Sequence, residues 1–488
     1  MLFLVLLATL GILILVYDKY KLRYWDRRGV KSVHGVPFFG HWLPVVLATK
    51  FAGVVYTEMY RLFNKERYFG VYEFHRPVLV LRDTKLIQDV LVKNFSHFSD
   101  HPNWIFDDRT FLRYSVLRLN GNFWRAVRYK FTPTFTGNMM DSAFKRLLKS
   151  APIDVNEGVL ETREIINKYA ADAIASYFAT TIVNKNEFQK TMRKMFDMPV
   201  LRYMEVLIVE HFPKLAKILG AQFVRSDDSI VFEEIMRELT RGPSEFRKLM
   251  LEIMNEGLIE MKAKDFDATG EGGNVFKYVA TEELMLGQVA QFIAGGLDTT
   301  GNTMAFIAYD LAKHPEAQKA ARLQIQTVLA KHGGQWSYDA VKELTYLQNV
   351  IYESTRLHPV LPFLFRDVTK DYTLDDGLIL RRGDKIVIPS IALQMDPDYY
   401  PEPEKFKPER WEEIREARNN FTWLPFGDGP RQCLGMRFAF MEMKFAFAKI
   451  LLDYDLSLGE EQEDPPKLHP RTFLTQIDGP LLINYKKL

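Results

Sequence analysis

Cys433 is the only cysteine in the 488-residue sequence, and its surroundings are unusual. The stretch PFGDGPRQCLG puts glycines on both sides of it and Arg431 two residues before it. An apolar helical pattern, CLGMRFAFMEMKFAFAKILL, starts at the cysteine. We therefore expect the thiol at or near a helix N-terminus, where free N–H groups and the helix dipole stabilise a thiolate. A single thiol excludes an internal disulfide and a zinc site built from paired cysteines.

Three roles are open to this cysteine. A lone cysteine is commonly a small buried apolar residue, but glycines that allow positive φ let a large group approach the backbone here. A nucleophile would need a base, and the nearest histidines, His358 and His469, stand in no recognisable motif. A metal ligand needs only this one thiolate if a cofactor supplies the other ligands, and haem iron fits that description.

The same stretch carries a family signature. FGDGPRQCLG has the pattern Phe-x-x-Gly-x-Arg-x-Cys-x-Gly at Phe426, Gly429, Arg431, Cys433 and Gly435. It resembles the haem-binding segment of the cytochrome P-450 family. The resemblance implies haem b as cofactor with Cys433 as its axial thiolate, Phe426 packed beside the cysteine, and Arg431 on a haem propionate.

A second candidate site is GGLDTT, Gly295 to Thr300, in the middle of a long helical pattern. Each glycine costs about 1 kcal/mol relative to alanine in a helix, so the segment indicates either a functional distortion or close helix packing. It resembles the oxygen-binding groove of the family. The resemblance implies that Asp298 and Thr299 are catalytic and deliver protons.

Further motifs follow the order that the family shows. Trp124 and Arg128 in NFWRAVRYKF resemble its Trp-x-x-x-Arg helix, and Arg366 matches a further propionate contact. These residues, with Arg431, would bind the two haem propionates, which need cationic partners when buried.

Another set is predicted to be structural. Glu353 and Arg356 lie three residues apart on one helix face and, by resemblance, join Arg410 of FKPERW in the core on the haem side.

The whole sequence indicates a mainly α protein with a small β portion. Helical periodicity dominates residues 120–360, a strand hairpin is predicted over 68–83, and short strands over 384–390 and at the C-terminus. No alternating βα repeat and no long linker is present, which favours one large domain. The resemblance implies the cytochrome P-450 fold, a helical prism that encloses haem. The net charge of +2 gives no electrostatic case for nucleic acid as a partner.

The N-terminus predicts a transmembrane helix. Residues 1–17 carry no charged side chain, and 17 helical residues span about 26 Å against a bilayer core of about 30 Å. A basic cluster follows, which places the remaining chain in the cytosol; a cleaved signal peptide, the rival interpretation, has its charges before the apolar run. We divide the chain into an anchor, 1–17, a basic and Pro/Gly linker, 18–40, and a single domain, 41–488. Residues 199–223 are apolar but interrupted, and predict either a shallow membrane contact or a buried helix pair.

These features predict a monooxygenase of the endoplasmic reticulum membrane. By resemblance to microsomal, insect xenobiotic-metabolising members, it would oxidise lipophilic substrates with dioxygen and electrons from an NADPH-dependent reductase. Lys130, Lys444 and Lys449 either dock that acidic partner or form a solvated face. Trp104, Phe106 and Phe111 either line the substrate pocket or pack their loop.

Two other functions are compatible with the fold. Thiolate-haem isomerases or dehydratases need no reductase, but they tend to lack the acid–threonine pair present here. A haem-binding sensor or carrier would bind haem without turnover.

Overall fold

A computed structural model describes residues 2–102, 111–178, 199–222, 233–234, 236–237, 244–262, 275–413 and 420–488. Helices make up most of these residues, as the sequence predicts. The helices of the first half are α1 (Leu2–Lys21), α2 (Leu43–Val46), α3 (Ala52–Leu62), α4 (Thr84–Gln88), α5 (Gly121–Phe131), α6 (Gly137–Ser150), α7 (Thr162–Phe178), α9 (Val200–His211) and α10 (Pro213–Leu219). Those of the second half are α12 (Glu245–Glu256), α13 (Glu282–Lys313), α14 (Pro315–Lys331), α15 (Tyr338–Glu343), α16 (Thr345–Leu357), α17 (Ser390–Leu393), α18 (Arg410–Glu413) and α19 (Met436–Asp453).

The strands form small sheets at the periphery. They are β1 (Tyr68–Glu73), β2 (Arg76–Leu81), β3 (Gly158–Glu161), β4 (Leu258–Lys262), β5 (Val275–Val279), β6 (Leu364–Asp367), β7 (Tyr372–Thr373), β8 (Ile379–Leu380), β9 (Lys385–Ile388), β10 (Tyr454–Leu458) and β11 (Leu482–Lys487). The largest sheet has the order β1-β2-β9-β6, with β9 parallel to β2 and antiparallel to β6. The predicted hairpin and the strands at 384–390 and at the C-terminus are confirmed.

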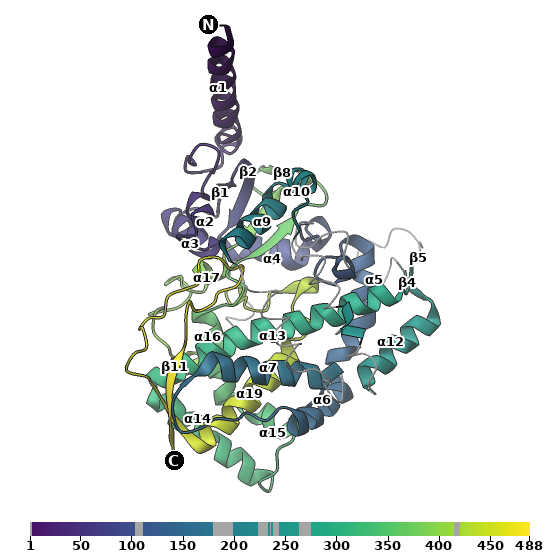
Figure 1. Cartoon of the computed structure of the whole chain (residues 1–488), viewed down its shortest axis with the longest axis vertical. Helices are drawn as coiled ribbons and strands as arrows, with labels where there is room; N and C mark the ends of the chain where they lie inside the picture. The colour runs from purple at the N-terminus through teal and green to yellow at the C-terminus, as the bar shows by residue number, and fades with distance from the viewer. Residues whose placement is uncertain are drawn as a thin grey trace.

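Helix α13 runs through the centre of the molecule and organises the core (Figure 1). It begins after Thr281, whose hydroxyl caps the helix by accepting from the N–H of Leu284. It packs along α7 and also contacts α16 and α19. Nearly all of its residues from Leu284 to Ala312 are at least partly buried, because the helix is apolar around most of its circumference.

The interrupted segment after Pro199 forms two helices, α9 and α10, which meet at Pro213. One face is in the core: Tyr203 and Leu207 are buried, and the Tyr203 hydroxyl donates to the carbonyl of Val45 at 2.7 Å. The other face is apolar yet open, with Leu201 84% and Ile218 80% exposed. The predicted burial of this helix pair is confirmed for one face, and the shallow membrane contact stays a prediction for the other.

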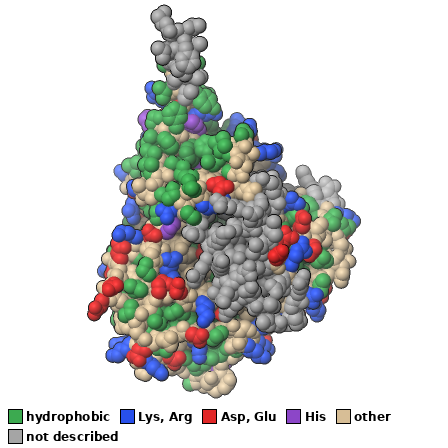
Figure 2. Space-filling model, viewed as in Figure 1, with side chains coloured by type: hydrophobic (Ala, Val, Ile, Leu, Met, Phe, Trp, Pro, Cys, Tyr) green, Lys and Arg blue, Asp and Glu red, His purple; other side chains and the backbone are tan. Residues whose placement is uncertain are grey.

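Helix α1 projects from the globular part, with the N-terminus at its tip (Figure 1). Where side chains are described, α1 shows open apolar residues such as Ile12 and Val16. Figure 2 shows hydrophobic side chains gathered around its base. Within the described part of the chain, however, no helix combines the length and the apolar character needed to cross a membrane. The predicted transmembrane helix over residues 1–17 thus has no support from the structure.

The segment after α1 is built into the domain. The indole of Trp25 is 1% exposed; its N–H donates to the carbonyl of Val71 at 3.1 Å, and the backbone N–H of Trp25 donates to the Tyr72 hydroxyl at 3.0 Å. A Cβ on Gly70 would lie 2.2 Å from the Trp25 ring, so only glycine fits beneath it. Asp18 is also buried and accepts from the N–H of Phe38 at 2.8 Å.

Candidate functional site

The Cys433 loop is a tight turn that precedes α19. Gly427 and Gly429 have φ of +66° and +70°, as expected from the sequence, and a Cβ on Gly429 would lie 2.0 Å from the carbonyl oxygen of Leu91. The loop closes where the N–H of Cys433 donates to the carbonyl of Phe426 at 2.8 Å. Gly435 differs from the expectation: its φ is −85°, and it is the N-cap of α19.

The thiol of Cys433 is open to contact but lies deep in the protein. The side chain has an accessible surface. The protein around it nevertheless keeps bulk water at a distance, so a charge on the sulfur would be poorly solvated. Burial therefore raises the pKa of the thiol, while backbone hydrogen bonds from Gly435 and Met436 and the charge of Arg128 lower it. The hydrogen bonds from Gly435 and Met436 are the N-terminal helix effect that the sequence predicts, but burial outweighs them and the pKa of the thiol is raised. A bound metal ion would lower it.

Phe426 lies beside the cysteine loop. Its ring is half-buried between Trp423 and Phe440, with centroid separations of 6.0 Å and 5.4 Å. This aromatic packing holds the start of the loop against α19.

Arg431 and Trp124 contact each other directly. The guanidinium carbon of Arg431 lies 3.8 Å from the centroid of the Trp124 ring, a cation–π geometry. Nε of Arg431 donates to the carbonyl of Ser99 and Nη2 to that of Leu119, both at 2.9 Å. Burial, followed by the charge of Arg366, sets the pKa of Arg431 well below its ordinary value.

Arg366 has a histidine partner that the sequence reasoning missed. Its Nη1 lies 3.1 Å from Nε2 of His101, whose Nδ1 lies 3.1 Å from the carbonyl of Leu117. Because a carbonyl only accepts, Nδ1 carries the proton and Nε2 accepts from Arg366. Burial and the charges of Arg431 and Arg366 set the pKa of His101 well below its ordinary value, so the ring is neutral.

The third arginine, Arg128, donates to the backbone carbonyl of Gln432 at 2.5 Å. Burial lowers the pKa of Arg128, and burial lowers that of Arg366 to about 10.

These arginines fit an anionic cofactor. Among the described residues, none of Arg128, Arg366 and Arg431 forms an ion pair with a carboxylate, and the buried Nε of Arg366 has no hydrogen-bond partner. Buried cations left without carboxylates are costly unless a bound anion pairs with them. Together with an accessible thiol, they form the donor set that a haem with two carboxylates requires.

Asp298 and Thr299 lie next to each other on α13, and each is partly accessible. Burial raises the pKa of Asp298 to about 6, against the lowering effects of Arg163 and of a hydrogen bond from Asn302. Thr299 donates its hydroxyl hydrogen bond to the carbonyl of Gly295, one turn back. Its backbone carbonyl in turn accepts from the hydroxyl of Thr303 at 2.8 Å.

The two adjacent glycines of α13 serve different purposes. A Cβ on Gly296 would lie 2.7 Å from the Ile174 side chain of α7, so close helix packing explains this glycine. A Cβ on Gly295 would meet only the side chain of Gln291, at 3.5 Å. The helix is continuous through both positions, so the structure shows close packing at Gly296 and no break in the helix at the predicted distortion.

Glu353, Arg356 and Arg410 form the predicted buried structural group. Both oxygens of Glu353 accept from Arg356, at 2.9 Å, and Oε1 also accepts from Arg410 at 2.9 Å. The indole N–H of Trp411 donates to Oε2 at the same distance. Glu353 and Arg356 are both 0% exposed, so the group acts within the core.

Some predictions for surface and pocket residues change. Lys444 is 3% exposed, its Nζ donates to the side chain of Gln348 at 2.8 Å, and burial lowers its pKa to about 8. Its suggested part in docking or in a solvated face is therefore wrong, because α15 and α16 cover it. Lys130 pairs with Glu256 at 2.5 Å. Phe111 is buried, whereas Trp104 and Phe106 lie outside the described residues.

Comparison with known proteins agrees with these motifs. The model of the family Cytochrome P450 matches residues 31–483. Cytochrome P450 6k1 of Blattella germanica is 30% identical over 512 aligned positions, which cover 99% of this chain and 97% of that protein. Probable cytochrome P450 6a13 of Drosophila melanogaster is 32% identical, with 96% of each chain covered. Cytochrome P450 6B1 of Papilio polyxenes is 29% identical, with 99% of each covered. The predicted resemblance to insect members is confirmed, and the chain belongs to the cytochrome P450 family of monooxygenases.

Proposed function

We propose that this protein is a haem-thiolate monooxygenase of the endoplasmic reticulum membrane that oxidises lipophilic small molecules, with electrons from an NADPH-dependent reductase. One observation carries the proposal: a single accessible thiol, Cys433, lies in the same region as buried arginines that have no carboxylate partner in the described part of the chain. When bound, the haem supplies the iron at which dioxygen is activated, one oxygen atom entering the substrate and the other leaving as water.

The residues of the chain divide this work. Cys433 would hold the iron, with the N–H groups of Gly435 and Met436 directed at its sulfur. Arg128, Arg366 and Arg431 would hold the two carboxylates of the cofactor. The ring of Trp124 packs against the guanidinium of Arg431 and holds it in place.

Asp298 and Thr299 would supply protons. A carboxyl group with a pKa of about 6 exchanges protons readily near neutral pH. The Thr299 hydroxyl, now donating to the carbonyl of Gly295, can turn about χ1 to pass a proton on. An acid and a hydroxyl on one turn of α13 thus form a short proton path.

Membrane attachment rests on two apolar surfaces. Residues 1–17 are uncharged, and the open faces of α9 and α10 add Leu201, Leu215, Ile218 and Leu219. Exposed apolar groups gathered in this way mark a surface that contacts a partner or a membrane. Alkaline carbonate extraction of membranes from expressing cells tests this part: the protein should stay in the pellet, and its release would remove the membrane from the proposal.

The haem-thiolate assignment is tested by the carbon monoxide difference spectrum of the reduced, membrane-expressed protein. We expect the long-wavelength Soret band of a thiolate complex in the natural protein and in a Gln432→Ala control. Cys433→Ala should lose that band. A variant that kept it, or a natural protein that showed only the shorter-wavelength band, would contradict the role of Cys433.

Turnover in the presence of a reductase tests the proposed monooxygenase activity and its electron supply. NADPH consumption that yields a hydroxylated lipophilic product supports the monooxygenase. A thiolate spectrum without NADPH consumption, in the presence of active reductase and over a panel of lipophilic compounds, would favour the sensor or carrier.

A further inference from the structure

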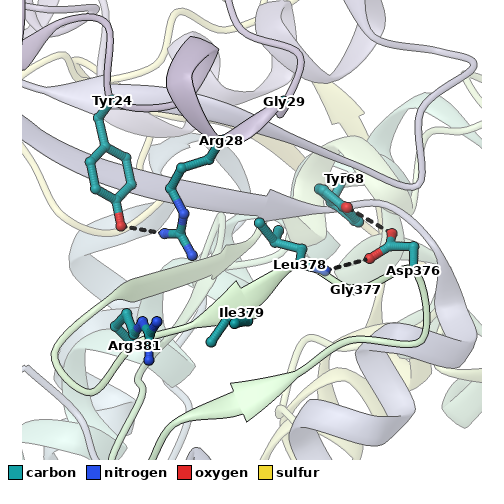
Figure 3. Close-up of a pocket in the computed structure, with 9 residues that line it drawn as sticks. All are labelled: Tyr24, Arg28, Gly29, Tyr68, Asp376, Gly377, Leu378, Ile379 and Arg381. Atoms are coloured by element: carbon teal, nitrogen blue, oxygen red, sulfur yellow. Dashed lines mark hydrogen bonds between the residues drawn. The ribbon is translucent and has the colours of Figure 1, made fainter.

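A pocket of about 670 Å³ lies far from Cys433 in sequence, where the segment after α1 meets the hairpin of β7 and β8 (Figure 3). It is lined by Tyr24, Arg28, Gly29, Tyr68, Asp376, Gly377, Leu378, Ile379 and Arg381. None of these residues belongs to the site described above. The elements that line it, the segment after α1 and strand β8, lie in the part of the molecule from which α1 projects (Figure 1).

One wall of this pocket is fixed to the domain. Trp25 is seated on Gly70, and the main chain of Lys31 accepts from the N–H of Gly70 at 2.8 Å. Tyr24 donates to Asp384 at 3.3 Å, which ties the wall to the turn before β9. The pocket is therefore a preformed feature and not a gap beside a loose tether.

Two arginines lie at one end of the pocket, and each is paired with an aspartate. Nη1 of Arg28 contacts the Tyr24 hydroxyl and lies 3.4 Å from Asp384, while Nη1 of Arg381 donates to Asp371 at 2.7 Å. Within the described part of the chain, the hydrogen-bond and ion-pair partners of both arginines contact only Nη1. The Nε and Nη2 donors of the two guanidinium groups can therefore bind an oxyanion such as a phosphate.

The other end is anionic and apolar. In Figure 3, Asp376 lies across the pocket from the two arginines. Its carboxylate accepts from the hydroxyl of Tyr68 at 2.7 Å and from the N–H of Leu378 at 3.2 Å, and lies 3.8 Å from Arg67. Ile379, 37% exposed, and Leu378 add apolar surface between the two ends.

We propose that this pocket binds the headgroup of a zwitterionic phospholipid, with its phosphate on Arg28 and Arg381 and its ammonium group on Asp376. A purely anionic ligand fits less well, since Asp384 and Asp371 already pair with the arginines and Asp376 lies at the other end of the pocket. The proposal rests on the membrane attachment proposed above, because α1 would bring this part of the molecule to the level of the headgroups.

Native mass spectrometry of the full-length, haem-loaded protein in an uncharged detergent tests the site. Phosphatidylcholine, phosphatidylethanolamine and phosphatidylserine are added separately, and bound lipid is counted. We expect one zwitterionic lipid bound about tenfold more tightly than phosphatidylserine. Arg381→Ala should weaken that binding about tenfold, and Asp376→Asn should remove the preference for the zwitterionic lipids.

Arg382→Ala is the matched control, because it removes the same charge from the next residue, which is exposed and does not line the pocket. Equal loss in Arg381→Ala and Arg382→Ala would overturn the proposal, as would equal binding of all three lipids. Displacement of the lipid by millimolar inorganic phosphate but not by glycerophosphocholine would show a phosphate site and would also overturn it.

The outcome is separable from the proposed function. The carbon monoxide spectrum of the same sample reports the haem site, and carbonate extraction reports membrane attachment. A sample with an intact thiolate spectrum that stays in the membrane pellet but binds no lipid in the pocket contradicts this inference alone.

Discussion

The guanidinium of Arg431 rests on the indole of Trp124, 3.8 Å from the ring centroid, so that the Cys433 loop is supported by helix α5. Trp124 is 2% exposed, and Phe95 packs against its ring at 5.7 Å. The two residues lie more than 300 positions apart in the chain, which makes the contact a bridge between the two halves of the site.

Trp124→Ala should weaken haem retention. The substitution removes a desolvated cation–π contact worth about 2 kcal/mol and leaves a cavity under Arg431. We expect a fall in haem content per protein and in melting temperature, measured on the purified enzyme. Trp124→Phe keeps a ring, so its haem content should lie between those of the natural protein and of Trp124→Ala. Full haem content in Trp124→Ala would show that the contact is dispensable.

Thr299→Ala should uncouple electron transfer from product formation. Loss of the hydroxyl removes one member of the proposed proton path but leaves α13 intact, because Thr299 bonds only within its own helix. Peroxide formed per NADPH consumed should rise about tenfold or more, with an unchanged carbon monoxide spectrum. Thr303→Ala is the control: its hydroxyl bonds one turn further along the same helix, and coupling should stay near normal.

Glu353→Ala should prevent the protein from folding into a haem-binding form. The carboxylate accepts from Arg356, Arg410 and Trp411, and its removal leaves two guanidinium groups buried without their partner. Breaking a buried ion pair in this way costs about 3–5 kcal/mol. Soluble, haem-loaded Glu353→Ala protein with normal thermal stability would contradict the structural role.

Glu442 should make the protein less stable as pH rises. Its carboxyl is 0% exposed and neither oxygen has a hydrogen-bond partner among the residues that the structure describes, so burial raises its pKa well above the ordinary value. The folded state thus keeps a proton that the unfolded chain releases above its pKa of about 4.3. Below that pH the contribution of Glu442 to the free energy of unfolding is fully present. As the pH rises toward the folded pKa, the free energy of unfolding falls by about 1.4 kcal/mol per pH unit.

Glu442→Gln should abolish this slope. Melting temperatures of the two proteins, measured from pH 5 to pH 8, should diverge with rising pH in favour of the glutamine variant. Glu413→Gln, at an exposed site, is the matched control and should follow the natural protein. If the melting temperatures of Glu442→Gln and the natural protein changed with pH in parallel, Glu442 would not release a proton on unfolding, and the prediction would be wrong.

The sequence was most informative where the signals are local. The Cys433 loop, its positive-φ glycines and the helix after it all lie between Pro425 and Asp453, and Glu353 and Arg356 share one helix turn. The arrangement that the sequence could not predict depends on distant partners. His101 meets Arg366 across 265 positions, and no pattern around it marks the contact. Strand β3 was missed for the same reason, because its partner is β11 at the C-terminus. Lys444 shows the same limit from the other side. An isolated lysine on an apolar helix pattern predicts a surface residue, but α15 and α16, which are distant in sequence, cover it.

The seating of Trp25 on Gly70 decides where this chain can be shortened. A soluble form made by deleting residues 1–30 would remove Asp18 and Trp25 together, strip the cover from Gly70, and leave the N–H of Phe38 and the carbonyl of Val71 without their partners. Such a protein would expose β1, the edge strand of the main sheet, to pairing with another molecule. A shortened chain that starts before Asp18 keeps the cover in place, so the useful cut lies inside α1 and not at the start of the catalytic domain.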